Sequence, residues 1–539
     1  MRKRLVSALV VLALLAALFP ACGMPQKGQG DGGSAFVDYE YGQELNIIDD
    51  NYRNYYEIFV YSFYDSDGDG TGDLQGVIQK LDYIEEMGFN GIWLMPIMPS
   101  PTYHKYDVTD YENIDPVYGD LEDFKQLTEA CHERGIRLVI DLVMNHSSSE
   151  HPWFTQACDY LISLPEGQEP DLSVCPYVDY YHFTTEQVNS TYYGVPGVNW
   201  WYEGAFWSEM PDLNLESEAL RAEFEKIADF WIELGVDGFR MDAALHFEEN
   251  DTTANNEILH WLYSYCLEKN PDFYMVSEVW ANAATIADYY GSATPSMFNF
   301  DAGSAEGKLI SAARNGKMSS LVQAMLDYQE DFSAENPQYI DAPFLTNHDM
   351  GRVANSVVSD PDKLKLAAGL LMMMNGSPFV YYGEEIGMKS SGTEDENKRL
   401  PMYWSDTDTT GITKGPAGSV GAPLSSLPSW EEQRADTDSL LNYYERALRL
   451  RNENPEIARG TVEKVESLCD GAQAAITKNY MDNTIGIVYN VSGEEITISL
   501  EGTVLSDMSI RGYLTLHQEK VSLEGQKLVL PPGSICILK

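Results

Sequence analysis

Short apolar runs alternate with amphipathic segments over most of the chain. In the amphipathic segments apolar residues recur at helical spacing, whereas the runs between them are short and rich in branched or aromatic side chains. Such alternation predicts successive strand–helix units with a parallel sheet. The predicted strands are Tyr56–Phe63, Asn90–Met95, Ile136–Leu142, Gly238–Asp242, Phe273–Glu278, Ser296–Phe300, Tyr339–Thr346 and Pro378–Glu385. The predicted helices are Leu74–Met87, Leu121–Arg134, Ala219–Leu234, Asn255–Lys269, Lys363–Met374 and Asp438–Glu453.

Two stretches depart from this alternation. Residues 147–212 are rich in Pro, Tyr, Trp and Gly and are too many for a structureless loop inside a compact domain. After about residue 457 the chain turns to short β-like segments such as GIVYN and LVLPP. We therefore predict an α/β fold, a (β/α)8 TIM barrel at 41–146 and 213–456, with a small domain inserted after strand 3 at 147–212 and a C-terminal antiparallel β-sandwich at 457–539.

The N-terminal residues have the pattern of an export signal. Basic MRKR precedes an apolar run from Leu5 to Phe19, and PACG follows. A small residue before Cys22 resembles a bacterial lipoprotein cleavage site, while an uncleaved anchor or ordinary signal cleavage are the alternatives. We predict a signal peptide at 1–22, lipidation of Cys22 and a flexible tether at 23–40. The protein would then be extracellular, anchored by lipid to the membrane at the bacterial cell surface, or otherwise secreted.

Charge and cysteine content narrow the classes of partner. With 84 acidic and 35 basic residues, the net charge of −49 repels phosphate backbones and argues against a nucleic-acid partner. The binding of an uncharged substrate is unaffected by this net charge. The cysteines after Cys22 lack CxxC spacing, which argues against zinc, and the pairs Cys158–Cys175 and Cys469–Cys536 are as compatible with disulfides as with buried thiols.

Carboxylates stand where three predicted strands end. Asp242 ends the fourth strand, Glu278 ends the fifth, and Asp349 follows the seventh. Side chains at the carboxyl ends of barrel strands project into the mouth, so these three should converge there. Like charges are costly to hold together for packing alone, and such a cluster is typical of a functional site. Arg240 should share an inward face with Asp242, although this pair by itself fits a surface ion pair equally well.

Four stretches in this order resemble the four signature regions of the α-amylase family, glycoside hydrolase family 13. They are DLVMNH (141–146), GFRMDAALH (238–246), SEVW (277–280) and FLTNHD (344–349). MPDLN (210–214) and GSPFVYYGEEIG (376–387) resemble two further family segments, and the MPDLN form resembles the subgroup intermediate between oligo-1,6-glucosidases and neopullulanases. The resemblance spans roughly residue 55 to the C-terminus.

The resemblance implies roles for the barrel-mouth residues. Asp242 would be the nucleophile, Glu278 the general acid/base, and Asp349 the third carboxylate, which grips sugar hydroxyls. A retaining glycosidase needs one carboxylate ionised for attack and one protonated for the leaving oxygen, and the positive Arg240 would favour the ionised form of its neighbour. The implied or expected substrate-binding residues are Tyr106, His146, Arg240, His348 and Trp280. Tyr106, in HKYD, would be an aromatic platform, or otherwise a core tyrosine.

Two features leave the product pattern open. Family members with this form of the second region carry Lys before the histidine, on the leaving-group side, where this chain has Leu245. Leucine cannot donate a hydrogen bond, so we expect a weaker or differently built subsite. The aromatic residues of the insert could line further subsites or form the core of the insert; they are Trp200, Trp201, Tyr202 and Trp207.

An acidic, glycine-rich loop follows the first predicted strand. DSDGDGTGD (65–73) places oxygen ligands at alternate positions, as a tight Ca²⁺ loop requires, but Gly76 stands where an EF-hand has its bidentate Glu. It resembles the calcium loop of oligo-1,6-glucosidase-like members, and the alternative is a solvated Asx-turn. The predicted Ca²⁺ ligands are Asp65, Asp67, Asp69, Thr71 and Asp73. The resemblance also implies a second calcium site at Asn145, Asp212 and His246.

From these residues we expect an α-amylase-type enzyme. It would be a retaining, endo-acting, monomeric hydrolase of α-1,4-glucosidic bonds in starch and maltooligosaccharides. The alternatives within the enzyme class are a cyclodextrinase- or neopullulanase-like enzyme and a 4-α-glucanotransferase-like enzyme. A non-catalytic glucan-binding surface protein is the alternative from another class. Such a protein would be indicated by the absence of one of the three carboxylates at the strand ends.

Overall fold

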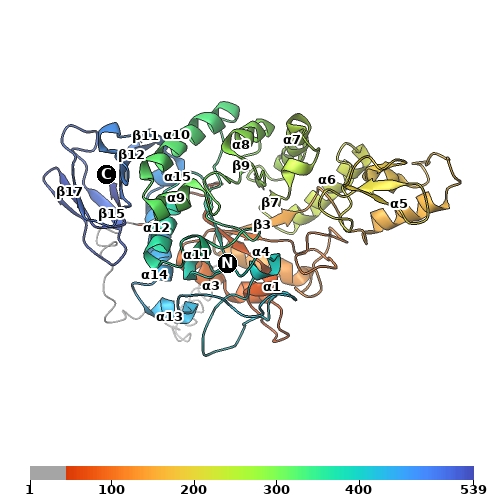
Figure 1. Ribbon diagram of the computed structural model, residues 1–539, viewed down its shortest axis with the longest axis horizontal. Coiled ribbons are helices and arrows are strands. Elements are labelled where there is room, and N and C mark those ends of the chain that lie inside the picture. Colours follow the sequence, from red (N-terminus) through yellow and green to blue (C-terminus); the bar gives the residue numbers. More distant parts are fainter. Residues whose placement is uncertain (1–43) are drawn as a thin grey trace, which may run out of the picture. The chain divides into compact units, whose positions relative to one another are not determined.

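Parallel strands form the centre of the fold (Figure 1). The computed structural model describes residues 44–539, so the predicted signal peptide, the tether and Cys22 lie outside the described residues. Seven strands form one sheet in the order β10-β1-β2-β3-β7-β8-β9. They are β1 (Tyr55–Ile58), β2 (Gly91–Leu94), β3 (Arg137–Leu142), β7 (Gly238–Met241), β8 (Tyr274–Ser277), β9 (Ser296–Met297) and β10 (Phe379–Tyr381). Almost every residue in these strands is buried, as expected where both faces are covered.

Isolated bridges close this sheet into a barrel. Phe298 pairs with Ala342, and Phe344 pairs with Phe379, both in parallel. The segment 342–344 therefore stands between β9 and β10, where the eighth strand belongs, and the predicted (β/α)8 barrel is confirmed. The predicted continuous strand Tyr339–Thr346 is wrong in detail, because Pro343 in its middle has no N–H to donate to a ladder.

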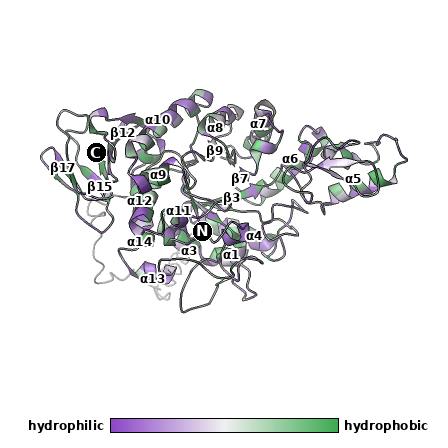
Figure 2. Cartoon of the chain, viewed as in Figure 1, coloured by the Kyte–Doolittle hydropathy of each residue, from purple (hydrophilic) through white to green (hydrophobic). Residues whose placement is uncertain are grey.

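Helices cover the outside of the barrel, and along them hydrophobic and hydrophilic residues alternate (Figures 1 and 2). Helix α4 begins at a capping box on Asp120 and buries Phe124, Leu127 and Cys131 against the sheet side. The helices of the barrel region are α1 (Val60–Phe63), α2 (Leu74–Gln79), α3 (Leu81–Met87), α4 (Leu121–Glu133), α6 (Glu218–Glu233), α7 (Thr252–Lys269), α8 (Ala283–Tyr289), α9 (Lys308–Asn315), α10 (Met318–Glu335), α11 (Val353–Ser356), α12 (Pro361–Met372), α13 (Trp430–Ala435), α14 (Leu440–Glu453) and α15 (Glu456–Arg459).

Some local predictions were wrong. The apolar run Tyr56–Phe63 is a strand only to Ile58 and then forms α1, because a short apolar run does not distinguish a buried strand from a buried helix. The helix predicted over Leu74–Met87 is interrupted at Lys80 and forms α2 and α3. We predicted none of α8, α9 and α10.

The segment between β3 and α6 has secondary structure of its own. It contains α5 (Pro152–Ser163), the 3-10 helix η2 (Pro176–Tyr180), and a three-stranded sheet of order β4-β6-β5. The strands are β4 (Phe183–Thr184), β5 (Tyr192–Gly194) and β6 (Trp201–Glu203). A bridge from His146 to Asp212 joins the two ends of this insert just after β3, and a bridge from Tyr181 to Leu213 ties its middle to the same place. The insert is therefore joined to the barrel at the mouth.

Two antiparallel sheets follow α15, which confirms the predicted C-terminal β-sandwich. One has the order β11-β12-β13-β18-β15 and the other β14-β17-β16, and a single apolar core that includes Val488, Leu528 and Cys536 lies between them. The strands are β11 (Thr461–Lys464), β12 (Gln473–Tyr480), β13 (Asn483–Asn490), β14 (Ile496–Ser499), β15 (Ile510–Leu514), β16 (Ser522–Glu524), β17 (Lys527–Leu530) and β18 (Ser534–Leu538).

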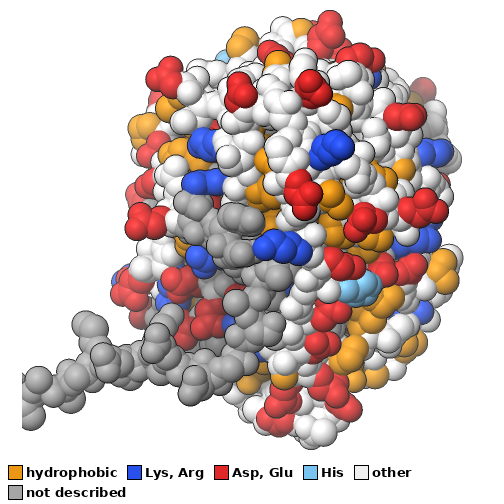
Figure 3. Space-filling model, turned by 90° about the vertical axis from the view of Figure 1, so that its left-hand side faces the viewer, with side chains coloured by type: hydrophobic (Ala, Val, Ile, Leu, Met, Phe, Trp, Pro, Cys, Tyr) orange, Lys and Arg blue, Asp and Glu red, His pale blue; other side chains and the backbone are white. Residues whose placement is uncertain are grey.

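The cysteines, the helices and the surface charge bear on the classes of protein considered from the sequence. The six cysteines of the described residues are free thiols, so neither disulfide left open by the sequence is present there. Within residues 44–539 no helix combines the length and apolarity needed to cross a membrane. On the face shown in Figure 3, Lys and Arg lie among more numerous acidic side chains and form no extended basic area.

Candidate active site

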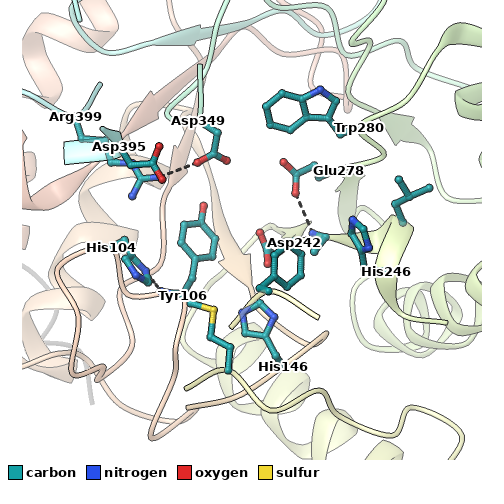
Figure 4. Close-up of a pocket in the computed structure, with 14 residues that line it drawn as sticks. His104, Tyr106, His146, Asp242, His246, Glu278, Trp280, Asp349, Asp395 and Arg399 are labelled. Carbon is teal, nitrogen blue, oxygen red and sulfur yellow. Dashed lines mark hydrogen bonds and ion pairs between the residues drawn. The ribbon is translucent and has the colours of Figure 1, made fainter. Parts of the chain in front are cut away.

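The ends of the barrel strands bring the three predicted carboxylates into one pocket. Asp242 follows β7, Glu278 follows β8, and Asp349 follows the 342–344 segment, and Figure 4 shows all three facing the same space. This pocket has a volume of about 330 Å³. It is lined by His104, Tyr106, His146, Phe206, Met210, Asp242, Ala243, Leu245, His246, Glu278, Trp280, Asp349, Asp395 and Arg399.

The guanidinium of Arg240 contacts two of the three carboxylates, those of Asp242 and Glu278. Its guanidinium is fully buried, and Nη1 lies 2.6 Å from Asp242 Oδ1 and 2.9 Å from Asp141 Oδ1, while Nη2 lies 3.1 Å from Glu278 Oε2. A planar guanidinium presents its donors in a fixed fork, so it sets both the spacing and the charge balance of these carboxylates. Arg240 itself does not line the pocket, so its predicted contact with substrate stays a prediction.

Glu278 has the environment of an acid. Burial raises the pKa of its carboxyl, Arg240 opposes that rise, and the negative charge of Asp242 adds to it. The backbone N–H of Ala243 donates to Glu278 Oε2 at 3.0 Å. Ala243 adopts a left-handed conformation, with φ of 49°, which costs energy for alanine and aims this N–H at the acid.

A buried chain of polar groups fixes Asp349. His348 Nε2 lies 2.6 Å from the Tyr106 hydroxyl and 3.0 Å from Asp349 Oδ2, and its Nδ1 lies 2.6 Å from Glu57 Oε1. Burial lowers the pKa of His348, but Asp349 and Glu57 outweigh it and raise that pKa to about 9. The histidine is therefore a cation at neutral pH. Burial also opposes ionisation of Asp349, yet His348 and Arg399 hold its pKa well below the usual range.

The predicted sugar-binding residues divide into two groups. Tyr106, His146 and Trp280 line the pocket, whereas His348 lies behind Tyr106 and is fully buried. Nε2 of His146 is buried without a hydrogen-bond partner in the protein, and burial lowers the pKa of this ring, which favours the neutral imidazole. Trp280 is 50% exposed and stacks on Phe300, with 5.0 Å between ring centroids.

Sequence reasoning missed several residues of the site. Arg399 donates to Asp349 Oδ1 at 2.7 Å and to the carbonyl oxygen of His348 at 3.2 Å, but it stands in a loop with no recognisable motif. Glu57 had a visible signal, because it is a carboxylate inside the buried apolar strand β1. Phe206 lines the pocket, although we singled out its neighbour Trp207.

Leu245 stands in the wall of the pocket on the side of the acid. Leu245 lines the pocket together with Glu278 and His246. His246 Nδ1 lies 2.6 Å from Glu249 Oε1, so its ring is partly engaged elsewhere. Leu245 itself offers no donor, and the weaker subsite predicted there stays a prediction.

The acidic loop after α1 gathers three of its five predicted ligands. Oxygen atoms of Asp65, Asp67 and Asp73 lie within 4.8 Å of one another, whereas the Asp69 carboxylate accepts the backbone N–H of Thr71 at 2.6 Å. Gly68 and Gly70 have φ of 87° and 103°, which lets the loop curl around this cluster. Clustered carboxylates fit Ca²⁺, a hard cation that prefers oxygen ligands.

The second predicted calcium site has a different arrangement. The Asn145 amide nitrogen lies 3.4 Å from Asp212 Oδ1, and Asp212 Oδ2 accepts the backbone N–H of Ala205 at 2.8 Å. Burial raises the pKa of Asp212 to about 7. Within residues 44–539, the acidic loop alone gathers three or more acidic, His or Cys side chains at metal-binding distance. The role of Asn145, Asp212 and His246 in binding calcium stays a prediction.

Comparison with known proteins agrees with the geometry. A family model described as the alpha-amylase catalytic domain matches residues 57–460. Alpha-amylase 3 of Dictyoglomus thermophilum is 38% identical over 504 residues, which cover 90% of this chain and 93% of that protein. A 4-alpha-glucanotransferase of Thermotoga maritima is 30% identical, and the match covers 82% of this chain and 96% of that protein.

A solved structure, Eubacterium rectale Amy13B, matches with a TM-score of 0.90 and 42% identity and covers 94% of this chain and 99% of its own. The family model includes Asp242, Glu278 and Asp349. The chain therefore belongs to the α-amylase family of glycoside hydrolases.

Proposed function

We propose that this protein is a retaining, endo-acting hydrolase of α-1,4-glucosidic bonds in starch and maltooligosaccharides. The observation that carries the proposal is the shared contact of Asp242 and Glu278 with adjacent nitrogens of Arg240. Contact with one guanidinium keeps the two carboxylates near each other, which suits the short spacing of a retaining enzyme better than the wider spacing of an inverting one. The raised pKa of Glu278 supports its role as the acid.

In the first step, Asp242 attacks the anomeric carbon of the sugar that lies against Tyr106. The glycosidic C–O bond breaks, and the proton of Glu278 goes to the leaving oxygen. The product is a glucosyl ester of Asp242. In the second step Glu278, now a carboxylate, takes a proton from water, the water oxygen attacks the same carbon, and Asp242 leaves. Two inversions give net retention.

The other residues bind and orient the sugar. The ionised Asp349, fixed by His348 and Arg399, accepts hydrogen bonds from sugar hydroxyls. The free Nε2 of His146 is a further partner for a hydroxyl, and the Tyr106 ring supplies an apolar face. Each contact that strengthens as the ring flattens toward the transition state lowers the barrier.

A digest of soluble starch, cyclodextrin and pullulan, with products resolved by size, tests this proposal. Rapid formation of mixed maltooligosaccharides from starch supports an endo-acting amylase. A preference for cyclodextrin or pullulan would favour a cyclodextrinase- or neopullulanase-like enzyme instead. The T. maritima relative makes a 4-α-glucanotransferase the second candidate, and products longer than the substrate would favour it. Absence of any cleavage would favour a glucan-binding protein, although all three carboxylates are present.

We propose that Ca²⁺ binds the loop of residues 65–73. The clustered oxygens of Asp65, Asp67 and Asp73 support this assignment, and with backbone oxygens they would supply a shell of the kind that Ca²⁺ takes. Lys414 donates from Nζ to the carbonyl oxygen of Asp69 at 2.8 Å and ties the loop to the segment after β10. The ion would therefore stabilise the junction of these segments and take no part in the chemistry.

We also propose that the protein is exported and anchored by lipid at Cys22. The basic, apolar and small-residue order of residues 1–23 supports this proposal. Metabolic labelling with a fatty-acid analogue should mark the wild type and not Cys22→Ala, which should appear in the medium. Equal labelling of both proteins would rule out Cys22 as the anchor.

A further inference from the structure

One large aromatic ring lies inside the barrel, behind the catalytic pocket. Trp93 stands in β2, is 1% exposed and does not line the pocket. Its ring centroid lies 5.4 Å from that of Phe298, just after β9, and 6.1 Å from that of Phe379 in β10. The indole therefore reaches across the barrel interior. Large apolar side chains fill the interior of such barrels, so by position alone Trp93 is a core residue.

Two cations of the active site contact this ring. The guanidinium carbon of Arg240 lies 5.1 Å from the centroid of the Trp93 ring, within the range of a cation–π interaction. The His348 ring, whose pKa of about 9 keeps it positive at neutral pH, meets the indole at 72° with 5.6 Å between centroids. Trp93 is thus one contact away from all three carboxylates, two of them through Arg240 and one through His348.

Two buried N–H groups at this contact have no hydrogen-bond acceptor in the protein. They are Nε of Arg240 and Nε1 of Trp93. The other nitrogens of the guanidinium face carboxylates, with Nη1 beside Asp141 and Asp242 and Nη2 beside Glu278. A buried donor without an acceptor is costly, and the negative face of an aromatic ring partly compensates a cationic donor. Trp93 therefore offers Arg240 a π face, while its own N–H gains nothing.

The ring contacts bear on the plane of the guanidinium. A planar fork can serve two carboxylates only in one orientation, so a contact that fixes this plane also fixes the nucleophile relative to the acid. Tyr106 contacts both cations too, with its ring centroid 5.8 Å from the guanidinium carbon and 5.6 Å from the His348 ring centroid. Tyr106 also lines the pocket, whereas Trp93 does not, so any effect of Trp93 on the reaction passes through the cations.

The charged and titratable groups around the two cations are few. Those that face Arg240 are Asp141, Tyr106, Asp242 and Glu278, and those that face His348 are Glu57, Tyr106 and Asp349. Among them Glu278 is the group from which the reaction needs a proton. Arg240 opposes the rise that burial causes in the pKa of Glu278, so a looser guanidinium would let that pKa rise further.

We propose that Trp93 is a positioning residue for glycosidic cleavage, whose ring fixes the plane of the Arg240 guanidinium and thereby the placement of Asp242 and Glu278. The inference rests on the proposed function. Because Trp93 does not reach the substrate, its loss should lower kcat and leave KM unchanged, the signature of an interaction that matters in the transition state.

Two substitutions grade the π contact. Trp93→Leu keeps an apolar side chain without a π face, while Trp93→Phe keeps a smaller ring and removes the unpaired N–H. On maltoheptaose we expect kcat to fall roughly tenfold in Trp93→Leu, the size of one desolvated cation–π contact, and less in Trp93→Phe. The alkaline limb of kcat/KM should move up by roughly half a pH unit in Trp93→Leu. The Tm of Trp93→Phe should change little.

A second buried tryptophan separates positioning from packing. Trp231 in α6 is fully buried, packs on Phe124 with 5.1 Å between centroids, and donates from Nε1 to the carbonyl oxygen of Tyr111 at 2.9 Å. Trp231→Leu should lower the Tm at least as much as Trp93→Leu, because it also leaves an acceptor unpaired, but its alkaline limb should match that of the wild type.

The outcomes are distinguishable. A lower Tm in Trp93→Leu with unchanged kcat and an unmoved alkaline limb would assign Trp93 to packing alone and overturn the inference. A raised KM with unchanged kcat would also overturn it, because Trp93 would then shape substrate binding. If the wild type cleaves cyclodextrin or pullulan but not maltoheptaose, the proposed function fails, and the same comparison on the cleaved glucan still tests Trp93.

Discussion

Replacement of Glu57 by glutamine tests the buried charge network behind Asp349. The glutamine side chain would keep the shape and the hydrogen-bond acceptor that faces Nδ1 of His348, 2.6 Å away, but it would remove one negative charge. The pKa of His348 rises from 6.5 to about 9, which corresponds to about 3 kcal/mol of preference for the charged form. Asp349 supplies the larger part, so we expect Glu57→Gln to cost about 1 to 2 kcal/mol at pH 6.

The sign of the pH dependence follows from the raised pKa. A histidine whose pKa is raised by folding contributes its full stabilisation below its ordinary value of 6.5, and it loses that stabilisation as pH rises through about 9. The cost of Glu57→Gln should therefore be largest near pH 6 and close to zero at pH 10. Urea denaturation of both proteins at the two pH values measures it, with the exposed Glu463→Gln as control. An equal cost at both pH values would refute the ion-pair account of His348.

Three further predictions concern the acid, the leaving-group side and the metal. Activity on starch should fall at alkaline pH, because Glu278 then loses the proton that it gives to the leaving oxygen. α-Glucosyl fluoride needs no acid, so the release of fluoride from it by Glu278→Gln should show no such fall. An alkaline fall that persists in this variant would assign the pH dependence to another group. Leu245→Lys should raise kcat/KM on maltooligosaccharides several-fold and leave the hydrolysis of α-glucosyl fluoride unaffected. Leu245→Met, which adds no donor, is the control. No gain with Leu245→Lys would mean that the leaving-group side is built differently. Calcium at about 100 times its Kd should stabilise the fold by about 2.7 kcal/mol. A chelator should therefore lower the Tm of the wild type but not the Tm of the double variant Asp65→Asn/Asp67→Asn. An unchanged wild-type Tm would exclude the loop site.

The barrel and its carboxylates were predictable from local patterns. Strand-end position determines which side chains reach a barrel mouth, so the placement of Asp242, Glu278 and Asp349 followed once the alternation was seen. The supporting residues were not predictable in this way. Glu57 and His348 are 291 positions apart, and Arg399 lies 50 positions beyond Asp349, so only the closed barrel brings them together.

Local backbone chemistry explains the errors in secondary structure. Pro343 breaks the hydrogen-bond ladder of the eighth strand and leaves two bridges. After Ile58, the apolar run turns into α1, since burial alone does not choose between strand and helix. The place of Phe206 in the pocket wall depends on how the insert packs at the mouth, which no periodicity reveals.

The central claim is that Asp242 attacks the sugar and Glu278 assists departure of the leaving group. Its most direct test is to incubate Glu278→Gln with 5-fluoro-α-glucosyl fluoride, whose good leaving group needs no acid, and to locate the trapped sugar by mass spectrometry of peptides. We predict one glucosyl adduct per chain, on Asp242, and none when Asp242→Asn is added. An adduct on another residue, or full turnover with Asp242→Asn, would contradict the account.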